Sequence, residues 1–296
     1  MELRVLQYFL AVAREQSIVR AAESLNLSQP TLSTQIKHME EELGKQLLIR
    51  GSKGSRRITL TEEGMILRKR AEEILELVKK AENEITLSES IIGDVTIGTG
   101  ETEGVRLPAK AAARLRAEQP GIRYHISSGN APFVTEQLDK GLIDFGIVLG
   151  SPDLKKYEAL KLPARDRWGV LMRKDAPLAS KEVISPEDLW NEPLILSREQ
   201  SDGGDVIQWL RRDLSALNIA ATYNLLFNAS LMVEEGLGYA ICLDKIVNTS
   251  GDSRLCFRPL SPQLELEMYV IWKKYQIFPK PAEKFLQVLR ESIDAE

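Results

Sequence analysis

The sequence has few residues of the kinds that bind metals or form disulfides. Only two cysteines, Cys242 and Cys256, and two histidines, His38 and His125, occur in 296 residues. The cysteines form no CxxC pair and neither lies near a histidine, so we expect no metal site, no cofactor and no disulfide framework. Two buried thiols in a reducing compartment are the simpler interpretation. Two histidines also leave few groups for acid–base chemistry near neutral pH.

Long apolar runs are absent as well, since none approaches the ~18 residues that a membrane helix needs. The first 16 residues carry scattered charges and no small-residue cleavage site, which is not typical of a signal peptide. We therefore expect a cytoplasmic protein with no membrane partner. The GxSxG, P-loop and HExxH motifs are missing too, so we expect no enzyme. Gly98, Gly100 and Gly104 resemble a dinucleotide loop only loosely, because their spacing is wrong.

The charge is unevenly distributed along a chain of ordinary globular composition, with 43% hydrophobic and 28% charged residues. The net charge is −4, but residues 1–60 contain nine Lys or Arg and six Asp or Glu, a balance of +3. Residues 61–296 therefore have a balance of −7. A basic N-terminal part on an acidic body predicts that any contact with DNA is confined to the N-terminal part.

The first 44 residues have the pattern of three helices. Ser17 and Ser28 are suitable N-caps for the second and third helices. Asn26 tolerates the backbone of a tight turn, and Gly44 suits the end of the third helix. Two helices joined by a very short turn are typical of a helix-turn-helix. The inward face of the third helix is predicted to consist of Leu32, Ile36, Met39 and Leu43.

The outward face of the third helix would enter the major groove with its N-terminal residues near base edges. Glutamine pairs bidentately with adenine, and Ser or Thr contacts several bases, whereas Lys37 suits phosphate. An ordinary three-helix packing domain with a solvated polar face is the alternative. The residues of this region that we predict to bind DNA are Ser28, Gln29, Pro30, Thr31, Ser33, Thr34 and Lys37.

Residues 47–50 and 57–60 are short strand-like runs around a loop, 51–56, that has two glycines and two cations. This arrangement predicts a β-hairpin wing whose basic tip touches backbone phosphate. The wing residues predicted to bind DNA are Arg50, Lys53, Arg56 and Arg57.

A further helix is predicted from Thr61, with apolar residues at alternating gaps of four and three. This spacing is an a/d seam over almost three heptads and favours dimerisation. A dimer would place two DNA-binding domains on two half-sites of the DNA. A helix that packs on its own domain is the alternative. The seam consists of Leu67, Ala71, Ile74, Val78, Ala81 and Ile85.

Residues 21–36, which read AAESLNLSQPTLSTQI, resemble the signature of LysR-type transcriptional regulators. So do residues 41–44, 47–50 and 60–64. The resemblance implies that Gln29, Pro30, Ser33 and Thr34 lie at base edges, while Arg50 and the wing cations contact the DNA backbone. It also implies a homodimer or a dimer of dimers on promoter DNA, with RNA polymerase as a further candidate partner.

Two positions depart from the family pattern. Ile18 stands where the family usually has phenylalanine, which is a plausible exchange in a core. Thr34 stands where arginine is common, so the resemblance does not carry the family's base preference and phosphate contact over to this position.

After residue 91, strand-like and helix-like stretches alternate in a βαβαβ order that predicts a largely parallel sheet with helices on its faces. This part resembles the effector-binding domain of the same family, two α/β lobes similar to a periplasmic binding protein. A transport binding protein is the rival interpretation, which the helix-turn-helix opposes. The expected domains are a winged helix-turn-helix over 1–60, a coiled-coil linker over 61–90 and an effector domain over 91–296. Its lobes are predicted as 91–162 with 268–296, and 163–267.

Ligands of open α/β sheets bind outside the carboxyl ends of strands. Helix N-termini at such ends suit carboxylates, but Glu101 and Glu103 add negative charge there. The charge therefore favours an acidic effector less, and a small-molecule effector with an amino group or without charge is an alternative. For each single residue, a helix cap or turn is the alternative role. The residues predicted to bind the effector are Thr99, Gly100, Glu101, Thr102, Ser128, Gly129, Asn130, Ser197, Arg198, Asn228 and Ala229.

Overall fold

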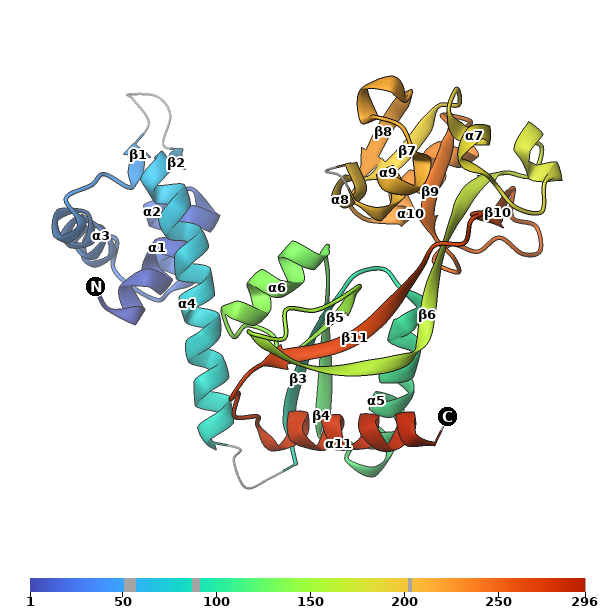
Figure 1. The fold of residues 1–296 in the computed structure, drawn as a ribbon. Coiled ribbons are helices and arrows are strands. Elements are labelled where there is room, and N and C mark those ends of the chain that lie inside the picture. The colour runs from blue at the N-terminus through green and yellow to red at the C-terminus, as the bar shows by residue number, and fades with distance from the viewer. Residues whose placement is uncertain (51–56, 87–90, 202–203, 296) are drawn as a thin grey trace. The chain divides into compact units, whose positions relative to one another are not determined.

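The computed structural model describes residues 1–50, 57–86, 91–201 and 204–295. The chain divides into two compact units, Met1–Thr86 and Leu87–Glu296, and each is described by itself. The helix that we predicted as a separate linker thus belongs to the first unit. Figure 1 shows a helical first unit and an α/β second unit.

The first unit is a helix-turn-helix with a β-hairpin and a long final helix. Its elements are α1 (Leu3–Glu15), α2 (Ile18–Ser24), α3 (Gln29–Leu43), β1 (Leu48–Arg50), β2 (Ile58–Leu60) and α4 (Glu62–Thr86). β1 and β2 pair antiparallel, as a wing requires. The predicted winged helix-turn-helix is therefore confirmed.

Local capping fixes the turn between α2 and α3. The Ser17 side chain accepts a hydrogen bond from Arg20 N, and the Ser28 side chain accepts one from Thr31 N at 3.2 Å. Asn26 adopts the left-handed conformation with φ 53° between the two helices. These caps satisfy N–H groups that a helix start leaves without partners, so Ser17 defines where α2 begins and Ser28 defines where α3 begins.

Three of the four residues predicted for the inward face of α3 are buried, namely Leu32, Ile36 and Met39. Leu43 was predicted to join them, but it is 41% exposed. The reason is its position in the last turn of α3, directly before the left-handed Gly44, where the helix ends.

The first half of α4 packs on its own unit, which is the alternative that we considered for the predicted dimer seam. Ala71 is completely buried in the helix-turn-helix core, and Leu67 and Ile74 pack partly buried against the same core. These three residues are therefore used within the chain. Ala81 and Ile85, further along the helix, are exposed.

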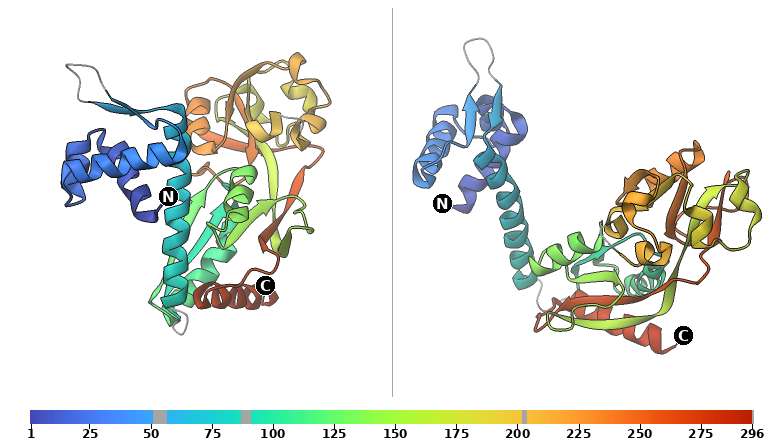
Figure 2. Two further views of the ribbon diagram at one scale, coloured as in Figure 1. Left: turned by 90° about the vertical axis from the view of Figure 1, so that its left-hand side faces the viewer. Right: turned by 45° about the horizontal axis from the view of Figure 1, so that its top comes forward.

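The second unit is built on a nine-stranded sheet in the order β4-β3-β5-β11-β6-β9-β7-β8, with β10 also paired to β6. Two long strands, β6 and β11, pair antiparallel and pass between two lobes (Figures 1 and 2). The remaining strands, apart from β10, pair in parallel within each lobe. In one lobe β3 pairs with β4 and β5, and in the other β7 pairs with β8 and β9. The predicted α/β architecture is confirmed, although the crossing strands make the sheet mixed.

Lobe I has helices on both faces of its sheet. α5 and α11 cover one face, where Phe145 and Ile147 are buried, and α6 covers the other, where Val148 is buried. Successive side chains of a strand point to opposite faces of the sheet, so neighbouring residues of β5 are buried under different helices. The elements are β3 (Gly93–Thr99), α5 (Arg106–Glu118), β4 (Ile122–Ser128), α6 (Ala131–Asp139), β5 (Phe145–Leu149), β6 (Tyr157–Arg173), β11 (Glu265–Lys273) and α11 (Lys280–Asp294).

Lobe II repeats the plan. Alternate residues of β9 enter two separate cores, with Ile241 on the side of α9 and Cys242 on the side of α10. Both cysteines are free and buried, as predicted. The elements are α7 (Pro186–Leu189), β7 (Leu194–Ser197), α8 (Arg198–Ser201), α9 (Asp205–Leu210), β8 (Ile219–Tyr223), α10 (Leu226–Glu234), β9 (Tyr239–Leu243) and β10 (Leu255–Pro259).

Candidate nucleic-acid interface and ligand cleft

The N-terminal end of α3 presents polar side chains to solvent. Gln29, Pro30, Thr31 and Thr34 are exposed and Ser33 is half-buried, on a helix whose opposite face is fixed in the core. Side chains at this end are free to meet base edges if α3 enters a major groove. The exposed Ser28 differs, because its hydroxyl caps the helix and lies 2.7 Å from the Thr31 hydroxyl.

Cations surround this face on neighbouring elements. Lys37 is exposed one turn further along α3, where its ammonium lies 3.3 Å from the Glu41 carboxylate. Such a surface pair is weak and would exchange readily for a phosphate. Arg50 is exposed at the end of β1, and Arg57 Nε donates a hydrogen bond of 2.9 Å to Gln16 Oε1. Lys53 and Arg56, predicted at the wing tip, lie outside the described residues.

The second unit has a cavity of about 210 Å³ where the carboxyl ends of strands from both lobes meet. Residues after β3 and β4 line it from lobe I, and residues after β7 and β8 line it from lobe II. Its polar lining is Glu101, Thr102, Asn130, Ser197, Glu199, Gln200, Asp205, Tyr223 and Asn224. Its position agrees with the rule that ligands bind outside the carboxyl ends of such strands.

The structure brings together six of the eleven residues predicted to bind an effector. The cavity is lined by Gly100, Glu101, Thr102, Gly129, Asn130 and Ser197. Asn130 is also the N-cap of α6, since its Oδ1 accepts a hydrogen bond from Phe133 N at 3.2 Å. The helix-cap role that we considered for these residues therefore coexists with a place in the cavity.

The other five predicted residues do not line the cavity. The Thr99 side chain is buried and donates a hydrogen bond of 2.9 Å to Gly100 O. Ser128 and Arg198 are exposed, and each is next in sequence to a residue that lines the cavity. Asn228 and Ala229 lie inside α10, one turn past the strand end, and Ala229 packs in the core of lobe II.

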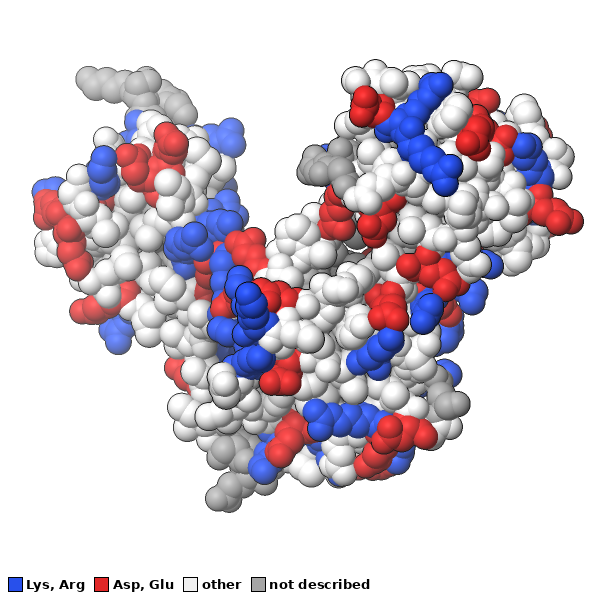
Figure 3. All heavy atoms as spheres, in the orientation of Figure 1, with Lys and Arg blue, Asp and Glu red and all other residues white. Residues whose placement is uncertain are grey.

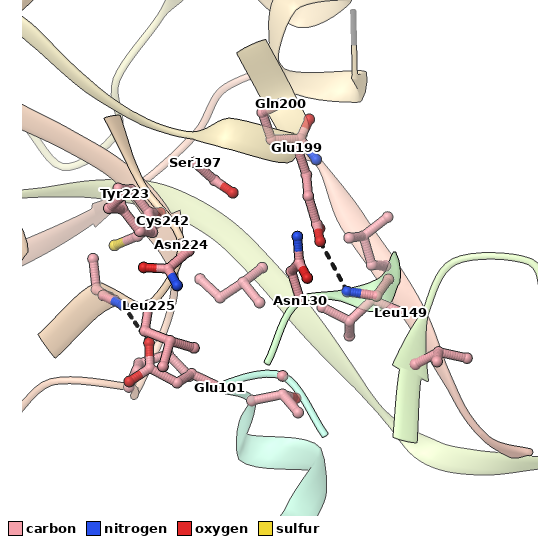
Figure 4. A pocket seen from close by; sticks show the side chains of 18 of the residues that line it. Glu101, Asn130, Leu149, Ser197, Glu199, Gln200, Tyr223, Asn224, Leu225 and Cys242 are labelled. Carbon is pink, nitrogen blue, oxygen red and sulfur yellow. Dashed lines mark hydrogen bonds between the residues drawn. The ribbon is translucent and has the colours of Figure 1, made fainter. Parts of the chain in front are cut away.

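Two carboxylates join the lobes across the cavity. Glu101 of lobe I accepts a hydrogen bond from Leu226 N at the start of α10 in lobe II. Glu199 of lobe II accepts one of 2.8 Å from Ala131 N at the start of α6 in lobe I. Figure 4 shows both contacts, with Glu101 and Asn224 on one side of the cavity and Glu199 and Asn130 on the other.

Asp166 lies on β6 close to where the strand leaves lobe I, and it is only 4% exposed. Burial raises the pKa of its carboxyl group, although the hydrogen bond that the Thr102 hydroxyl donates to it acts in the opposite direction. Thr102 also accepts a hydrogen bond from Gly104 N at 2.9 Å. One hydroxyl thus ties a cavity-lining loop to the crossing strand.

The thiol of Cys242 lines the cavity but is unsuited to chemistry. Complete burial raises its pKa far above the ordinary value for cysteine, so the nucleophilic thiolate is absent near neutral pH. Tyr223 is similar, because burial raises its pKa and its hydroxyl donates to Ile241 O at 2.8 Å. In the part of the chain that the structure describes, no group of three or more His, Cys, Asp or Glu is placed to hold a metal ion.

Sequence reasoning missed Trp168, Glu199, Gln200 and Asn224. Glu199 and Gln200 directly follow the predicted pair at 197–198, so extending that segment by half a turn would have included them. Asn224 follows β8, a strand that was not predicted because its residues are mostly half-exposed and show no clear apolar alternation. Trp168 lies one residue before the apolar run 169–172, which the sequence predicts as a strand.

Comparison with known proteins identifies both units. Residues 3–65 match the bacterial regulatory helix-turn-helix family of LysR proteins, and residues 88–294 match the LysR substrate binding domain. Among the described residues, none of the helices has the length and apolar character to span a membrane.

Curated relatives resemble the chain over its whole length. The HTH-type transcriptional regulator YvbU of Bacillus subtilis is 29% identical, with 100% of both chains covered. The Hca operon transcriptional activator HcaR of Escherichia coli is 28% identical, with 99% of this chain and 98% of HcaR covered.

Solved structures show the same fold. Full-length CbnR in complex with its target DNA superposes with a TM-score of 0.73 at 20% identity, covering 99% of this chain and 100% of CbnR. A full-length OxyR variant from Pseudomonas aeruginosa superposes with a TM-score of 0.56 at 26% identity, covering 99% of each chain. With both domain families matched in order, the chain belongs to the LysR family of DNA-binding transcriptional regulators, which have a C-terminal effector-binding domain.

Proposed function

We propose that this protein binds promoter DNA through α3 and the wing, and that a small molecule in the cavity between the lobes controls this binding. The observation that carries the proposal is the cavity, lined from both lobes in a chain whose other unit exposes the polar end of a helix-turn-helix. The CbnR complex with DNA supports the first half by its fold.

Base reading is assigned to Gln29, Pro30, Thr31, Ser33 and Thr34, which lie at or near the exposed N-terminal end of α3. Ser28 sets the start of the helix. Contacts to phosphate are assigned to the cations Lys37, Arg50 and Arg57, together with Lys53 and Arg56. Phosphate contacts fix the register of the protein on the duplex, while base contacts carry the specificity.

Self-association is assigned to the exposed side of α4. Ile66 is 60% exposed, Leu77 is 37% exposed and Ile85 is 77% exposed. These positions, with Ala81, fall within about a third of the helix circumference at 3.6 residues per turn. Val78 borders them. A second copy of the chain would cover this apolar stripe. The dimer would then have the two DNA-binding domains that paired half-sites require.

Control by the ligand is assigned to the crossing strands. Besides the two carboxylate contacts, β6 and β11 connect the lobes, so the angle between the lobes is set at few places. A molecule in the cavity touches both lobes and therefore favours one relative pose. It changes DNA binding only to the extent that its affinity differs between the two poses.

The test is a footprint of the full chain on the promoter fragment beside its gene, with and without a pool of small metabolites. We expect protection of two half-sites whose centres lie about 10 base pairs, or a multiple of that, apart on one face of the DNA. We expect at least one metabolite pool to change the protected region. A footprint that stays the same with every pool would remove ligand control from the proposal.

A further inference from the structure

The lining of the cavity is acidic. Glu101, Glu199 and Asp205 contribute three carboxylates. Within the ranges that the structure describes, the lining includes neither Lys, Arg nor His. Figure 3 shows acidic side chains at the edge of the hollow between the lobes. A bound anion would meet this charge without a cationic partner, and an unpaired charge in a partly buried site is strongly disfavoured.

The places that would otherwise attract an anion are already occupied. Helix N-termini are the usual binding sites for carboxylate or phosphate groups. Here the N-terminus of α10 donates to Glu101, and that of α6 donates to Glu199 at 2.8 Å. Each carboxylate uses one oxygen for this contact, and an ionised carboxylate has about four acceptor sites. Both therefore keep acceptor capacity for a cation in the cavity.

A second feature of the cavity, independent of its charge, also points to a ligand. Trp168 lines it, is 5% exposed, and its Nε1–H has no hydrogen-bond partner among the described residues. A buried donor without a partner is disfavoured, because it has lost water and gained nothing in exchange. The nitrogen itself is closed off from the cavity, so an acceptor atom on a ligand would satisfy this donor if the indole ring turns toward it on binding.

The cavity also has an apolar part, and its space is small. Leu149, Leu243, Ile246 and Leu266 line the same cavity as Trp168. The volume of about 210 Å³ is below the range of roughly 300–1,000 Å³ that is usual for drug-sized ligands. The cavity thus has room for a small metabolite with an apolar body.

We infer that the ligand of this cavity is a small organic cation, with an ammonium or amidinium group between Glu101 and Glu199, an apolar body, and a hydrogen-bond acceptor for Trp168. This inference rests on the proposed function, because it names the chemical class of the molecule that the cleft binds.

Four flexible probes of similar length separate the parts of this inference. ε-Aminocaproamide has the cation and an amide acceptor, hexylamine has only the cation, caproamide only the acceptor, and adipate monoamide an anion with the acceptor. Calorimetric titration of the full chain should rank ε-aminocaproamide first and hexylamine second. Adipate monoamide should be the weakest.

Two variants assign the contacts. Glu101→Gln keeps an acceptor for Leu226 N but removes the charge, so affinity for ε-aminocaproamide should fall about tenfold or more. Glu103→Gln removes the same charge two residues away, where the carboxylate pairs with Arg106 and does not line the cavity, and should leave the affinity unchanged. Trp168→Phe should abolish the advantage of ε-aminocaproamide over hexylamine.

Equal or tighter binding of adipate monoamide would overturn the inference, as would no binding of either amine at millimolar concentration. Equal losses in Glu101→Gln and Glu103→Gln would also overturn it. The footprint separates this failure from failure of the proposed function. A footprint that responds to a metabolite pool keeps ligand control even if the amines do not bind, and amine binding that leaves every footprint unchanged keeps the ligand class but removes the regulatory role.

Discussion

Gln29 is the first residue of α3, and its side chain is exposed where the helix would meet base edges. Gln29→Ala should weaken binding to the specific site by roughly 1–3 kcal/mol and leave binding to random DNA nearly unchanged, because a bidentate contact to a base is lost. Competition binding with both DNAs measures this difference.

Gln35→Ala is the matched control, because Gln35 lies on the same helix but away from the exposed N-terminal face. It should change neither affinity. Equal losses on specific and random DNA for Gln29→Ala would mean that Gln29 contacts the backbone and not a base.

Asp166 makes the stability of the second unit depend on pH. Because burial raises its pKa in the folded chain, the carboxyl group favours folding most when it is protonated, below the pKa of about 4 of an unfolded aspartate. This contribution is lost as pH rises through the higher folded pKa. Asp166→Asn, which keeps an acceptor for Thr102, should raise the melting temperature near neutral pH, and the gain should shrink toward acidic pH.

The control for this prediction is Asp252→Asn, which removes the same charge from an exposed position. It should give no gain that depends on pH in this way. Thermal unfolding monitored by tryptophan fluorescence follows the second unit alone, since all four tryptophans lie after residue 160. A melting difference for Asp166→Asn that is constant from acidic to neutral pH would contradict the account.

The residues at strand ends were predictable where the strand itself was recognised. Glu101 and Thr102 follow β3, and Asn130 follows β4, both strands with clear β-branched or apolar runs. Asn228 was selected in place of Asn224 because the end of β8 could not be located. The unpartnered state of Trp168 depends on tertiary packing, and no sequence pattern reports it.

At the scale of the element, α4 shows why a heptad seam does not by itself identify a dimer. Leu67, Ala71 and Ile74 keep the a/d spacing, yet they pack against the helix-turn-helix core. An apolar stripe has the same spacing whether its partner is a neighbouring helix of the same chain or a second copy. The sequence left both alternatives open, and the structure assigns the first half of the stripe to the chain itself.

Ala71→Leu tests this assignment. Ala71 is 0% exposed, so three more carbon atoms must displace the core, and we expect a loss of about 1–3 kcal/mol in the stability of the first unit. Lys79→Leu inserts the same side chain at an exposed position of α4 outside the apolar stripe and should change that stability by less than about 0.5 kcal/mol. Amide hydrogen exchange of α1 reports both values. Similar small effects for the two variants would show that Ala71 is not part of the core.

The length of β6 could not be predicted for a physical reason. Only its last third is continuously buried, and Pro163 interrupts the earlier part, where a proline argues against a central strand. In the structure this part lies near the register shift between Glu267 and Tyr269 of β11, the irregularity where the strands pass between the lobes. A bulge accommodates the proline, so the strand continues through it.

In the molecule as a whole, the order of domains and a ligand site at the strand ends followed from the sequence, whereas the contacts between the lobes did not. The family signature over residues 21–36 predicted the first unit, and the alternation of strands and helices after residue 91, with its resemblance to the effector-binding domain, predicted the second unit and its two lobes. Which side chains from the two lobes meet depends on the crossing of β6 and β11. The contacts of Glu101 with Leu226 and of Glu199 with Ala131 join residues that are 125 and 68 positions apart.

The most direct test of the whole account compares the wild-type chain with Asn224→Trp and Gln29→Ala in one footprinting experiment. Asn224 is an exposed residue that lines the cavity, and a tryptophan there should fill the space without touching a core. The promoter fragment is footprinted with and without the metabolite pool that changes the wild-type pattern.

We expect Asn224→Trp to protect the same DNA as the wild type but no longer to respond to the metabolite pool. We expect Gln29→Ala to protect the DNA poorly under both conditions. If Asn224→Trp responds to the pool as the wild type does, the signal does not enter through the cavity and the proposed ligand control is wrong.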